Sequence, residues 1–408
     1  MKKIYKQKKY TRKKYKVLFS CGSRPELIKL APLYHHMKLE QDIEPILCLT
    51  GQHKDLVAPL LTPFDLQPDF LLDTLRPGQS LPELMRRLFR ELTPVFEQIS
   101  PHMLILQGDT SSALAAAIIG QKLSLKIAHV EAGLRTHDLT APFPEEINRQ
   151  TISKLSDWHF CPTQTARQNL LKENIADQKI FVTGNTVIDM VNKTRSKPLP
   201  PLKSIIGEKD WSRPYFLLTL HRRESLGSPL IRILSAIKDI AHRHQNFDII
   251  LPVHPNPQVK LAIREFLGDC DNICLTEPLS YPECIVLMSN AYAILTDSGG
   301  LQEEAPALNT PLLILRDKTE RMEGVECGSL RLCGTEADKI RREVDLLIQD
   351  KAHYNRMCRA RNPFGDGRAS MRITAHLMDI LKGRDIKGPK DFNDTKTYIS
   401  ERPRHHHP

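Results

Sequence analysis

The chain has 408 residues, of which 40% are hydrophobic and 26% are charged. This length exceeds what one hydrophobic core usually serves and suits two domains, and the composition is that of a globular protein. No run of about 18 apolar residues occurs, and the apolar segment of a signal peptide is missing, so we expect a cytoplasmic protein without a membrane-spanning helix.

Short apolar runs alternate with longer amphipathic segments along most of the chain. In chain order, the runs predict strands at residues 16–21, 44–50, 102–108, 125–131, 158–163 and 179–184, and then at 215–221, 247–254, 272–277, 291–297 and 311–316. Helices are expected between them, such as 24–38, which has Pro25 just inside its start, and 111–123. This alternation predicts two Rossmann-like domains with parallel sheets, whose ligands bind at the carboxyl ends of the strands in a deep interdomain cleft.

The organisation that we expect has five parts, divided near a proline-rich stretch at residues 198–201. They are a basic amino-terminal arm at 1–16, an N-terminal Rossmann-like domain at 17–190, a C-terminal Rossmann-like domain at 191–365, a helix at 366–385 that packs back on the N-terminal domain, and a polar tail at 386–408.

The net charge of +10 is concentrated in the amino-terminal arm. Residues 1–16 contain eight Lys, one Arg and no acidic residue, so the rest of the chain is close to neutral. The arm is either a disordered solubilising tail or a segment that touches an anionic membrane surface or nucleic acid. Nothing later in the chain indicates a specific nucleic-acid partner.

The cysteine content indicates a reduced protein without a metal centre. The chain has nine Cys, an odd number, and no CxxC pair. Several of them lie inside apolar runs, where a free thiol behaves as a small hydrophobic side chain.

The segment CGSRPELIK, residues 21–29, joins a strand to a helix start through a glycine. Arg24 and Lys29 lie near that helix start, where backbone N–H groups favour an anion. The pattern predicts a phosphate site, and the alternative is a capped helix with surface cations.

The segment DSGGLQEEAP, residues 297–306, follows the same logic in the second half. Ser298 and Gly299 would let the backbone approach a ligand, and Glu303 or Glu304 could accept hydrogen bonds from sugar hydroxyls. Helix capping by the serine and the acids is the alternative.

The segment LHRRES, residues 220–225, places His221, Arg222 and Arg223 after an apolar strand. Adjacent guanidiniums would suit a diphosphate, although Glu224 could instead pair with one of them.

Three carboxylates form the candidate acid/base set: Asp109, Glu131 and Glu145. Asp109 and Glu131 end neighbouring strands, and carboxylates gathered in a cleft acquire separated pKa values that suit proton abstraction and return. Each could also be a helix cap or an ion-pair partner, with Arg135 and Arg149 as candidate partners. Prolines interrupt residues 129–150, so we expect this segment to be a loop. The sequence lacks the P-loop, GxGxxG, HExxH and GxSxG motifs, which leaves a phosphate-bearing ligand and carboxylate chemistry without metal or nicotinamide.

The motifs together resemble the non-hydrolysing UDP-N-acetylglucosamine 2-epimerases. They follow one another over roughly residues 16–380 as GSRPELIKLAPL, TGQHKDL, LQGDTSSA, HVEAGLRT, PFPEEINRQ, VTGNTVID, TLHRRES, PVHPNP, TDSGGLQEEAP, RDKTERMEGVECG and NPFGDGRAS. The resemblance implies a GT-B-type fold, a UDP-sugar substrate, no cofactor and a homodimer. It also implies reversible conversion of UDP-GlcNAc to UDP-ManNAc through elimination of UDP, a 2-acetamidoglucal intermediate and re-addition, in the synthesis of surface polysaccharide precursors.

The same resemblance assigns roles to individual residues. The catalytic positions are Asp109, Glu131, Glu145 and His221. The substrate-binding positions are Arg24, Lys29, Arg135, Ser298, Gly299, Glu304 and Arg321. Gln52, Arg222 and His254 match a second, activating UDP-GlcNAc site of some bacterial members. Asp55 stands where Gln or Glu is usual, so activation stays open.

Four other functions remain as alternatives at this point. A 2-epimerase for a UDP-HexNAc altered at C3 or C6 would share these motifs. A GT-B glycosyltransferase would use the same nucleotide site but need an acceptor. A hydrolysing epimerase would release free ManNAc and UDP, and a non-catalytic UDP-sugar sensor would not need the acid set.

Overall fold

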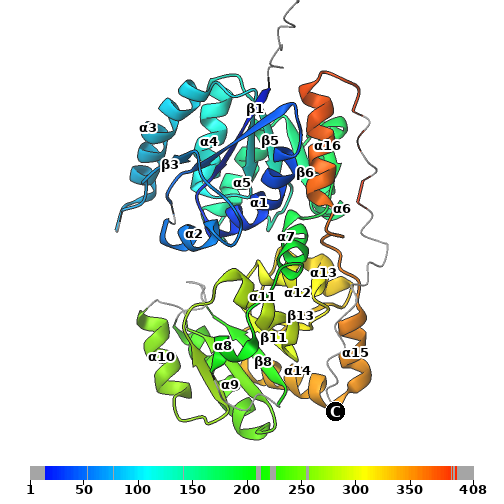
Figure 1. The fold of residues 1–408 in the computed structure, drawn as a ribbon. Coiled ribbons are helices and arrows are strands. Elements are labelled where there is room, and N and C mark those ends of the chain that lie inside the picture. The colour runs from blue at the N-terminus through cyan, green and yellow to red at the C-terminus, as the bar shows by residue number, and fades with distance from the viewer. Residues whose placement is uncertain are drawn as a thin grey trace, which may run out of the picture.

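The computed structural model describes residues 14–52, 54–76, 78–140, 142–207, 213–220, 227–253, 257–386, 388 and 391–392. Its core is two parallel β-sheets, one in each half of the chain (Figure 1). The predicted α/β architecture of two Rossmann-like domains is therefore confirmed. Of the predicted arm at residues 1–16, residues 1–13 lie outside the described residues, whereas Tyr15 and Lys16 begin the first strand.

The first sheet has seven strands in the order β3-β2-β1-β4-β5-β6-β7. The strands are β1 (Tyr15–Cys21), β2 (Ile43–Leu49), β3 (Phe70–Leu71), β4 (Met103–Gln107), β5 (Lys126–Val130), β6 (Trp158–Cys161) and β7 (Ile180–Val182). Every pair in it is parallel, so all its strand ends point the same way. The order reverses beside β1, which is the switch point where Rossmann-like sheets bind ligands.

The second sheet has six strands in the order β10-β9-β8-β11-β12-β13. The strands are β8 (Tyr215–Thr219), β9 (Asp248–Pro252), β10 (Ile273–Thr276), β11 (Ala293–Thr296), β12 (Leu312–Ile314) and β13 (Leu330–Leu332). All pairs are again parallel, with the switch point beside β8. Two of the shortest strands, β3 and β13, are absent from the predicted set.

Helices cover both faces of each sheet (Figure 1). Those in the first half are α1 (Arg24–Lys38), α2 (Lys54–Leu61), α3 (Leu81–Ile99), α4 (Ser111–Lys122), α5 (Glu145–Leu155), α6 (Gln164–Lys172) and α7 (Thr186–Arg195). Those that follow are α8 (Leu202–Ile206), α9 (Ser228–Arg243), α10 (Pro257–Leu267), α11 (Tyr281–Asn290), α12 (Leu301–Ala307), α13 (Met322–Glu326), α14 (Ala337–Gln349), α15 (Lys351–Arg359) and α16 (Ala369–Leu381).

Successive side chains along a strand point to opposite faces of the sheet and pack into different hydrophobic cores. On β1, Leu18 packs with the α3 and α4 core, while Val17 and Phe19 belong to the core that contains α1. This second core continues through α7 into one face of the second sheet. The period of two along each strand thus buries both faces, as parallel sheets require.

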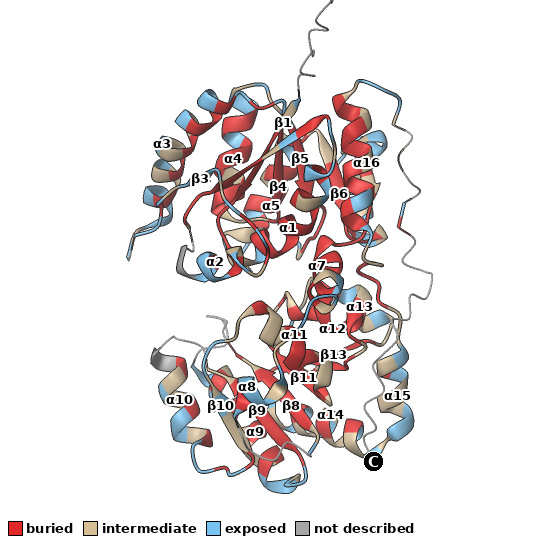
Figure 2. Cartoon of the chain, in the orientation of Figure 1, coloured by how far each residue is buried: buried red, intermediate tan, exposed pale blue. Residues whose placement is uncertain are grey.

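Helix α7 lies between the two halves of the molecule. It packs against α1 and α16 on one side and against α11 and α12 on the other. Figure 2 shows that α7 and α12 are largely buried. Helix α16 returns to the first half and also contacts α1 (Figure 1).

Residues 129–150 were expected to be a loop, and this is wrong at both ends, because 129–130 belong to β5 and 145–150 to α5. Helix α5 begins at Glu145, directly after the last proline of the segment, Pro144. Proline is tolerated at a helix start because the first N–H groups have no partner within the helix. Among the described residues, no helix is long and apolar enough to cross a membrane.

Candidate active site

Glu131 follows β5 directly and has an unusual backbone conformation. Its φ angle is +62°, in the left-handed region that non-glycine residues rarely occupy. Holding such a residue there costs on the order of 1–3 kcal/mol, and strain of this kind concentrates at functional positions. Six other described non-glycine residues share this conformation, so the backbone points to a function for Glu131 only together with its charged partners.

Five residues from both halves of the chain form a buried charge cluster around this carboxylate: Lys29, Glu131, Asn185, Glu303 and Arg321. Lys29 Nζ contacts Glu131 and lies 3.2 Å from Glu303 Oε2. Asn185 Nδ2 donates to Glu131 at 2.7 Å and to Glu303 at 2.9 Å. Arg321 Nε donates to Glu303 Oε1 at 2.9 Å. Two cations thus face two carboxylates within these five residues, and Arg321 also contacts the carboxylate of the buried Glu320 side chain.

The two carboxylates of the buried charge cluster differ in pKa. Burial would raise the pKa of Glu131, but the charges of Lys29 and Arg321 and the hydrogen bonds outweigh it, so this pKa is lowered. For Glu303, burial outweighs the same two cations and the pKa is raised. Neighbouring carboxylates with separated pKa values can hold one proton and one negative charge at the same pH.

Asp109 ends the neighbouring strand and has its own partner. Gln107 pairs with Val130 in the sheet, so the residues after β4 lie beside Glu131. Arg149 Nη2 contacts Asp109 Oδ2 at 2.5 Å, and the Asp109 side chain is 26% exposed. Arg149 comes from α5, which therefore fixes a solvent-accessible carboxylate at the edge of the buried charge cluster.

The consecutive acids at the start of α5 differ in their surroundings. Glu145 is half-buried, whereas Glu146 is fully buried. Glu146 accepts hydrogen bonds from the backbone N–H groups of Thr136 and His137 at 3.1 and 3.3 Å, and burial is outweighed so that its pKa is lowered. Glu146 therefore anchors the preceding loop and leaves Glu145 as the acid of this pair that could face a ligand.

Arg135 does not have the surroundings expected of a substrate-binding residue. Its side chain is 0% exposed, and it forms a double hydrogen bond with Glu173 at 2.6 and 2.8 Å. It also donates to Leu134 O and to Ser153 Oγ. The guanidinium donates to these partners and stabilises the loop after Glu131. These contacts do not support a direct contact between Arg135 and the substrate.

The start of α1 is capped by Ser23 and Glu26. A capped helix was the alternative to the predicted phosphate site. The backbone N–H groups of Gly22 and Ser23 donate to Glu26 Oε2 at 2.9 and 2.7 Å. Thr110 Oγ1 donates to Glu26 Oε1 at 2.8 Å, and burial raises the pKa of Glu26. These backbone N–H groups are therefore directed to an internal carboxylate, which supports the capped-helix alternative, and a phosphate site at Arg24 and Lys29 stays a prediction.

The start of α12 differs from that of α1. It has no side-chain cap, and space is open where a side chain on Gly300 would project. Ser298 is half-buried, and its backbone N–H donates to Thr296 Oγ1. Glu304 is buried and accepts from Tyr281 Oη at 3.2 Å, and burial raises its pKa to about 7. This segment, including Gly299, keeps the features expected of a nucleotide-binding turn.

The remaining predicted positions lie around the buried charge cluster or outside the described residues. Arg24 is half-buried, and its Nη2 reaches Leu279 O in the second half at 3.4 Å. Gln52 accepts from Ser112 Oγ at 2.6 Å. His221, Arg222 and His254 lie outside the described residues. No group of His, Cys, Asp and Glu that could hold a metal ion occurs in the part of the chain that the structure describes.

Asn185 and Glu303 are cluster members that the sequence had not assigned to catalysis. Asn185 follows β7 and caps α7 through its own side chain. Its place at a strand end in VTGNTVID was the available signal. Glu303 had been considered only as a partner of sugar hydroxyls, beside Glu304.

Opposed parallel sheets with charged side chains meeting at their strand ends define a two-domain α/β enzyme of GT-B-like fold. The family model described as UDP-N-acetylglucosamine 2-epimerase matches residues 35–378. The chain therefore belongs to the UDP-N-acetylglucosamine 2-epimerase family. Among curated relatives, the enzyme of that name from Yersinia pestis is 44% identical over 368 residues, which are 89% of this chain and 98% of the relative. The one from Escherichia coli K12 is 43% identical over 377 residues, 91% and 99% of the two chains.

Solved structures agree in both fold and family. A UDP-GlcNAc 2-epimerase from Neisseria meningitidis bound to UDP-GlcNAc has a TM-score of 0.83 and 37% identity, covering 89% of this chain and 100% of that one. The S. aureus MnaA–UDP complex has a TM-score of 0.87 and 36% identity, covering 93% and 100%. A glycosyltransferase from Rickettsia africae, with a TM-score of 0.57 and 13% identity, shares the fold alone.

Proposed function

We propose that the protein interconverts UDP-N-acetylglucosamine and UDP-N-acetylmannosamine by reversible epimerisation at C2 of the sugar. The family membership supports the activity, and the similar enzyme from Neisseria meningitidis has a structure described as bound to UDP-GlcNAc. The buried charge cluster is the observation that carries the chemistry, because it holds a strained carboxylate where both halves meet. The product would supply precursors for surface polysaccharides.

The proposed reaction is an elimination followed by re-addition. A carboxylate takes the proton from C2, the electrons of that C–H bond form a C1–C2 double bond, and the C1–O bond breaks with its electron pair on UDP. The resulting 2-acetamidoglucal stays bound beside UDP. Protonation of the opposite face of C2, with return of the UDP oxygen to C1, completes the inversion.

The acid set for these transfers is Asp109, Glu131 and Glu145. A proton abstractor must be ionised near neutral pH, and the lowered pKa of Glu131 satisfies this. Asp109 lies on the adjacent strand end with an accessible side chain. Glu145 stands half-buried at the start of α5. His221 is proposed as the fourth catalytic group, near the leaving diphosphate, on the family resemblance.

The nucleotide is proposed to bind the second half at Ser298, Gly299 and Glu304. The uncapped start of α12 supports this placement, as does a buried carboxylate able to accept ribose hydroxyl protons. Arg24, from the first half, would lie near the diphosphate. Lys29 and Arg321 are proposed to act on the sugar side, because in the structure both contact buried carboxylates. Gln52, Arg222 and His254 remain the proposed second, activating site.

Incubation of the purified protein with UDP-GlcNAc in D2O, followed by proton NMR, tests the proposal. We expect both UDP sugars to appear, with deuterium at C2 because the abstracted proton exchanges with solvent. Accumulation of free ManNAc with UDP would instead indicate a hydrolysing enzyme. Turnover without C2 deuterium would refute the proton-transfer route, and no turnover would redirect attention to a UDP sugar altered at C3 or C6 or to a transferase.

Substitution of the acids separates catalysis from binding. Asp109→Asn and Glu131→Gln should each lower kcat by roughly 10²–10⁴-fold, the usual contribution of a positioned acid or base. UDP affinity, measured by calorimetry, should change little, because the proposed nucleotide contacts come from Arg24 and the second half and not from these two acids. Glu97→Gln, an exposed acid on α3, is the matched control and should keep full activity.

A further inference from the structure

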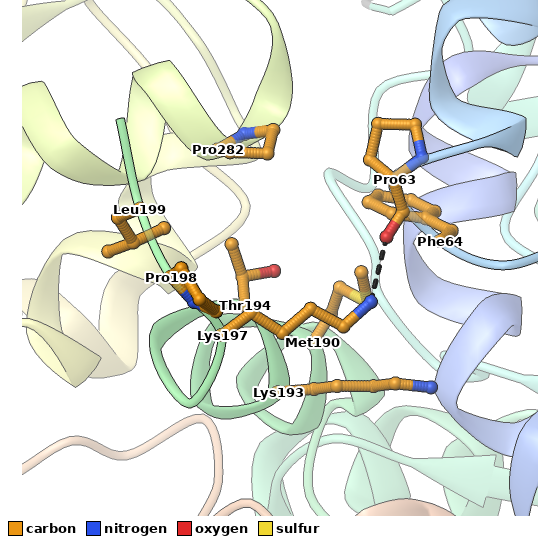
Figure 3. Close-up of a pocket in the computed structure, with 9 residues that line it drawn as sticks. All are labelled: Pro63, Phe64, Met190, Lys193, Thr194, Lys197, Pro198, Leu199 and Pro282. Carbon is orange, nitrogen blue, oxygen red and sulfur yellow. Dashed lines mark hydrogen bonds between the residues drawn. The ribbon is translucent and has the colours of Figure 1, made fainter. Parts of the chain in front are cut away.

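A cavity of about 150 Å³ lies where α7 leaves the first half and the chain enters the second. We call it the α7 cavity. Its apolar wall contains Phe64, Met190, Leu199 and Pro282, from segments of both halves (Figure 3). Phe64 is buried and held edge-on against Tyr281, with ring centroids 5.5 Å apart. The wall therefore has a fixed shape made by both halves.

Two lysines of α7 and its continuation also line the α7 cavity. Lys197 Nζ donates to Pro63 O at 2.9 Å, the contact drawn in Figure 3. Among the described residues, neither the half-buried Lys193 nor the exposed Lys197 has a carboxylate within ion-pair distance, although the more distant Asp65 acts on Lys193. Burial and the charge of Lys197 lower the pKa of Lys193. Two cations at an apolar wall thus lack a direct counter-charge.

A buried hydroxyl adds to the unused polar capacity of the wall. Thr194 is 5% exposed, and its Oγ1 has no hydrogen-bond partner among the described residues. In Figure 3 this oxygen projects from α7 toward the space between the labelled side chains. An unsatisfied buried polar group costs on the order of 1–3 kcal/mol. This oxygen is closed to water in the structure, so a ligand atom would pair with it only after a small shift of the Thr194 side chain.

We propose that the α7 cavity binds a small organic anion with a compact apolar body. The body would pack against Phe64, Met190 and Leu199, and the acidic group would lie against Lys193 and Lys197. A dry cavity of roughly 150 Å³ accommodates a single benzene-sized ring, which sets the size of the ligand. A monocarboxylate with one ring meets both the volume and the charge.

This site would be separate from the proposed nucleotide site and would join the two halves. Its residues come from the turn after α2, from α7 with its continuation, and from the start of α11. A ligand that contacts both halves favours the relative position of the halves in which all its contacts form. If another ligand also prefers one relative position of the halves, each of the two ligands changes the binding affinity of the other by the same factor.

Titration of the full chain with benzoate, followed by ligand-observed NMR, tests the proposal. We expect saturable binding at least about tenfold tighter than that of benzamide, which has the same shape without the charge. Lys193→Gln should weaken benzoate binding by about tenfold, and Leu199→Trp, which fills the cavity, should abolish it. Lys203→Gln, an exposed lysine on α8, is the matched control and should bind benzoate as the wild type does.

Two further measurements keep the outcome decisive. Each variant should retain UDP binding, which shows that it is folded, and excess UDP should not displace benzoate. Equal binding of benzoate and benzamide, displacement of benzoate by UDP, or unchanged binding in both Lys193→Gln and Leu199→Trp would overturn the proposal. Absence of saturable benzoate binding to the wild type would overturn it as well.

Discussion

Replacement of Lys29 by Met removes one of the two cations of the buried charge cluster while keeping a side chain of similar length. The side chains of Lys29, Glu131 and Glu303 are only 6%, 7% and 1% exposed. Arg321, which also pairs with the buried side chain of Glu320, would then be the single cation of the buried charge cluster beside its two carboxylates. Breaking a buried pair by removing one partner typically costs about 3–5 kcal/mol, so we expect the free energy of unfolding at neutral pH to fall by that amount.

The pH dependence of this loss identifies its cause. In the wild type, the lowered pKa of Glu131 contributes stability above the unfolded-state pKa, and this stability is lost as the pH falls through the folded-state pKa. In Lys29→Met, burial without Lys29 raises that pKa instead, so a carboxylate is forced to ionise in the interior near neutral pH. The deficit should therefore shrink as the pH falls toward about 5, where protonation removes the unpaired charge.

Urea unfolding at several pH values measures the effect. A second substitution, Glu303→Gln, should restore about 1–3 kcal/mol in the Lys29→Met background, because it returns the buried charge cluster to neutrality. Lys122→Met, at an exposed position in the last turn of α4, should change stability by less than about 0.5 kcal/mol. A deficit below about 1 kcal/mol, or one that neither pH nor Glu303→Gln alters, would refute this account.

Three further substitutions have defined outcomes. The pKa of Glu304 is raised to about 7, so its contribution to stability is present below the unfolded-state pKa and lost as the pH rises through about 7. In urea unfolding, Glu304→Gln should have the same free energy of unfolding as the wild type near pH 4. Above pH 8, its free energy of unfolding should be about 3 kcal/mol higher than that of the wild type. Gly22→Ala would place a Cβ 2.3 Å from Thr50 Oγ1, so we expect a loss of about 1–3 kcal/mol by the same assay, whereas wild-type stability would contradict the packing. Glu173→Gln leaves Arg135 with a neutral partner; kcat should fall while UDP affinity holds, and an unchanged kcat would argue against its bracing of the loop after Glu131.

Most of the fold could be predicted from the sequence because both sheets are buried on both faces. Continuous apolar runs such as residues 102–108 and 291–297 are characteristic of such strands. Strand β3 was missed because it has only two residues, and β13 because its three residues include Arg331, whereas the equally short β7 and β12 are wholly apolar. Runs that short lack a period, and only pairing with a neighbour identifies them as strands.

Site residues that directly follow a strand could be predicted from the sequence. Contacts between segments far apart in the chain could not. Asp109 and Glu131 follow strands that can be recognised locally. The link between Asn185 and Glu303 joins the two halves, and the partner of Arg135 lies beyond another helix, so neither could be inferred from local sequence. The cap at α1 was within reach, because a Ser followed three residues later by Glu is the signature of a capping box.

The side-chain amide of Asn185 gives the molecule a means of coupling its shape to its acid–base chemistry. Glu131 receives Lys29 from its own half, but Arg321 and Glu303 reach it from the other half. If the halves separated, Glu131 would lose the long-range attraction of Arg321 and gain water, and Asn185 could no longer bridge two acids. The pKa of Glu131 would then depend on the distance between the halves. The site would therefore assemble and acquire the pKa of its base in a single step.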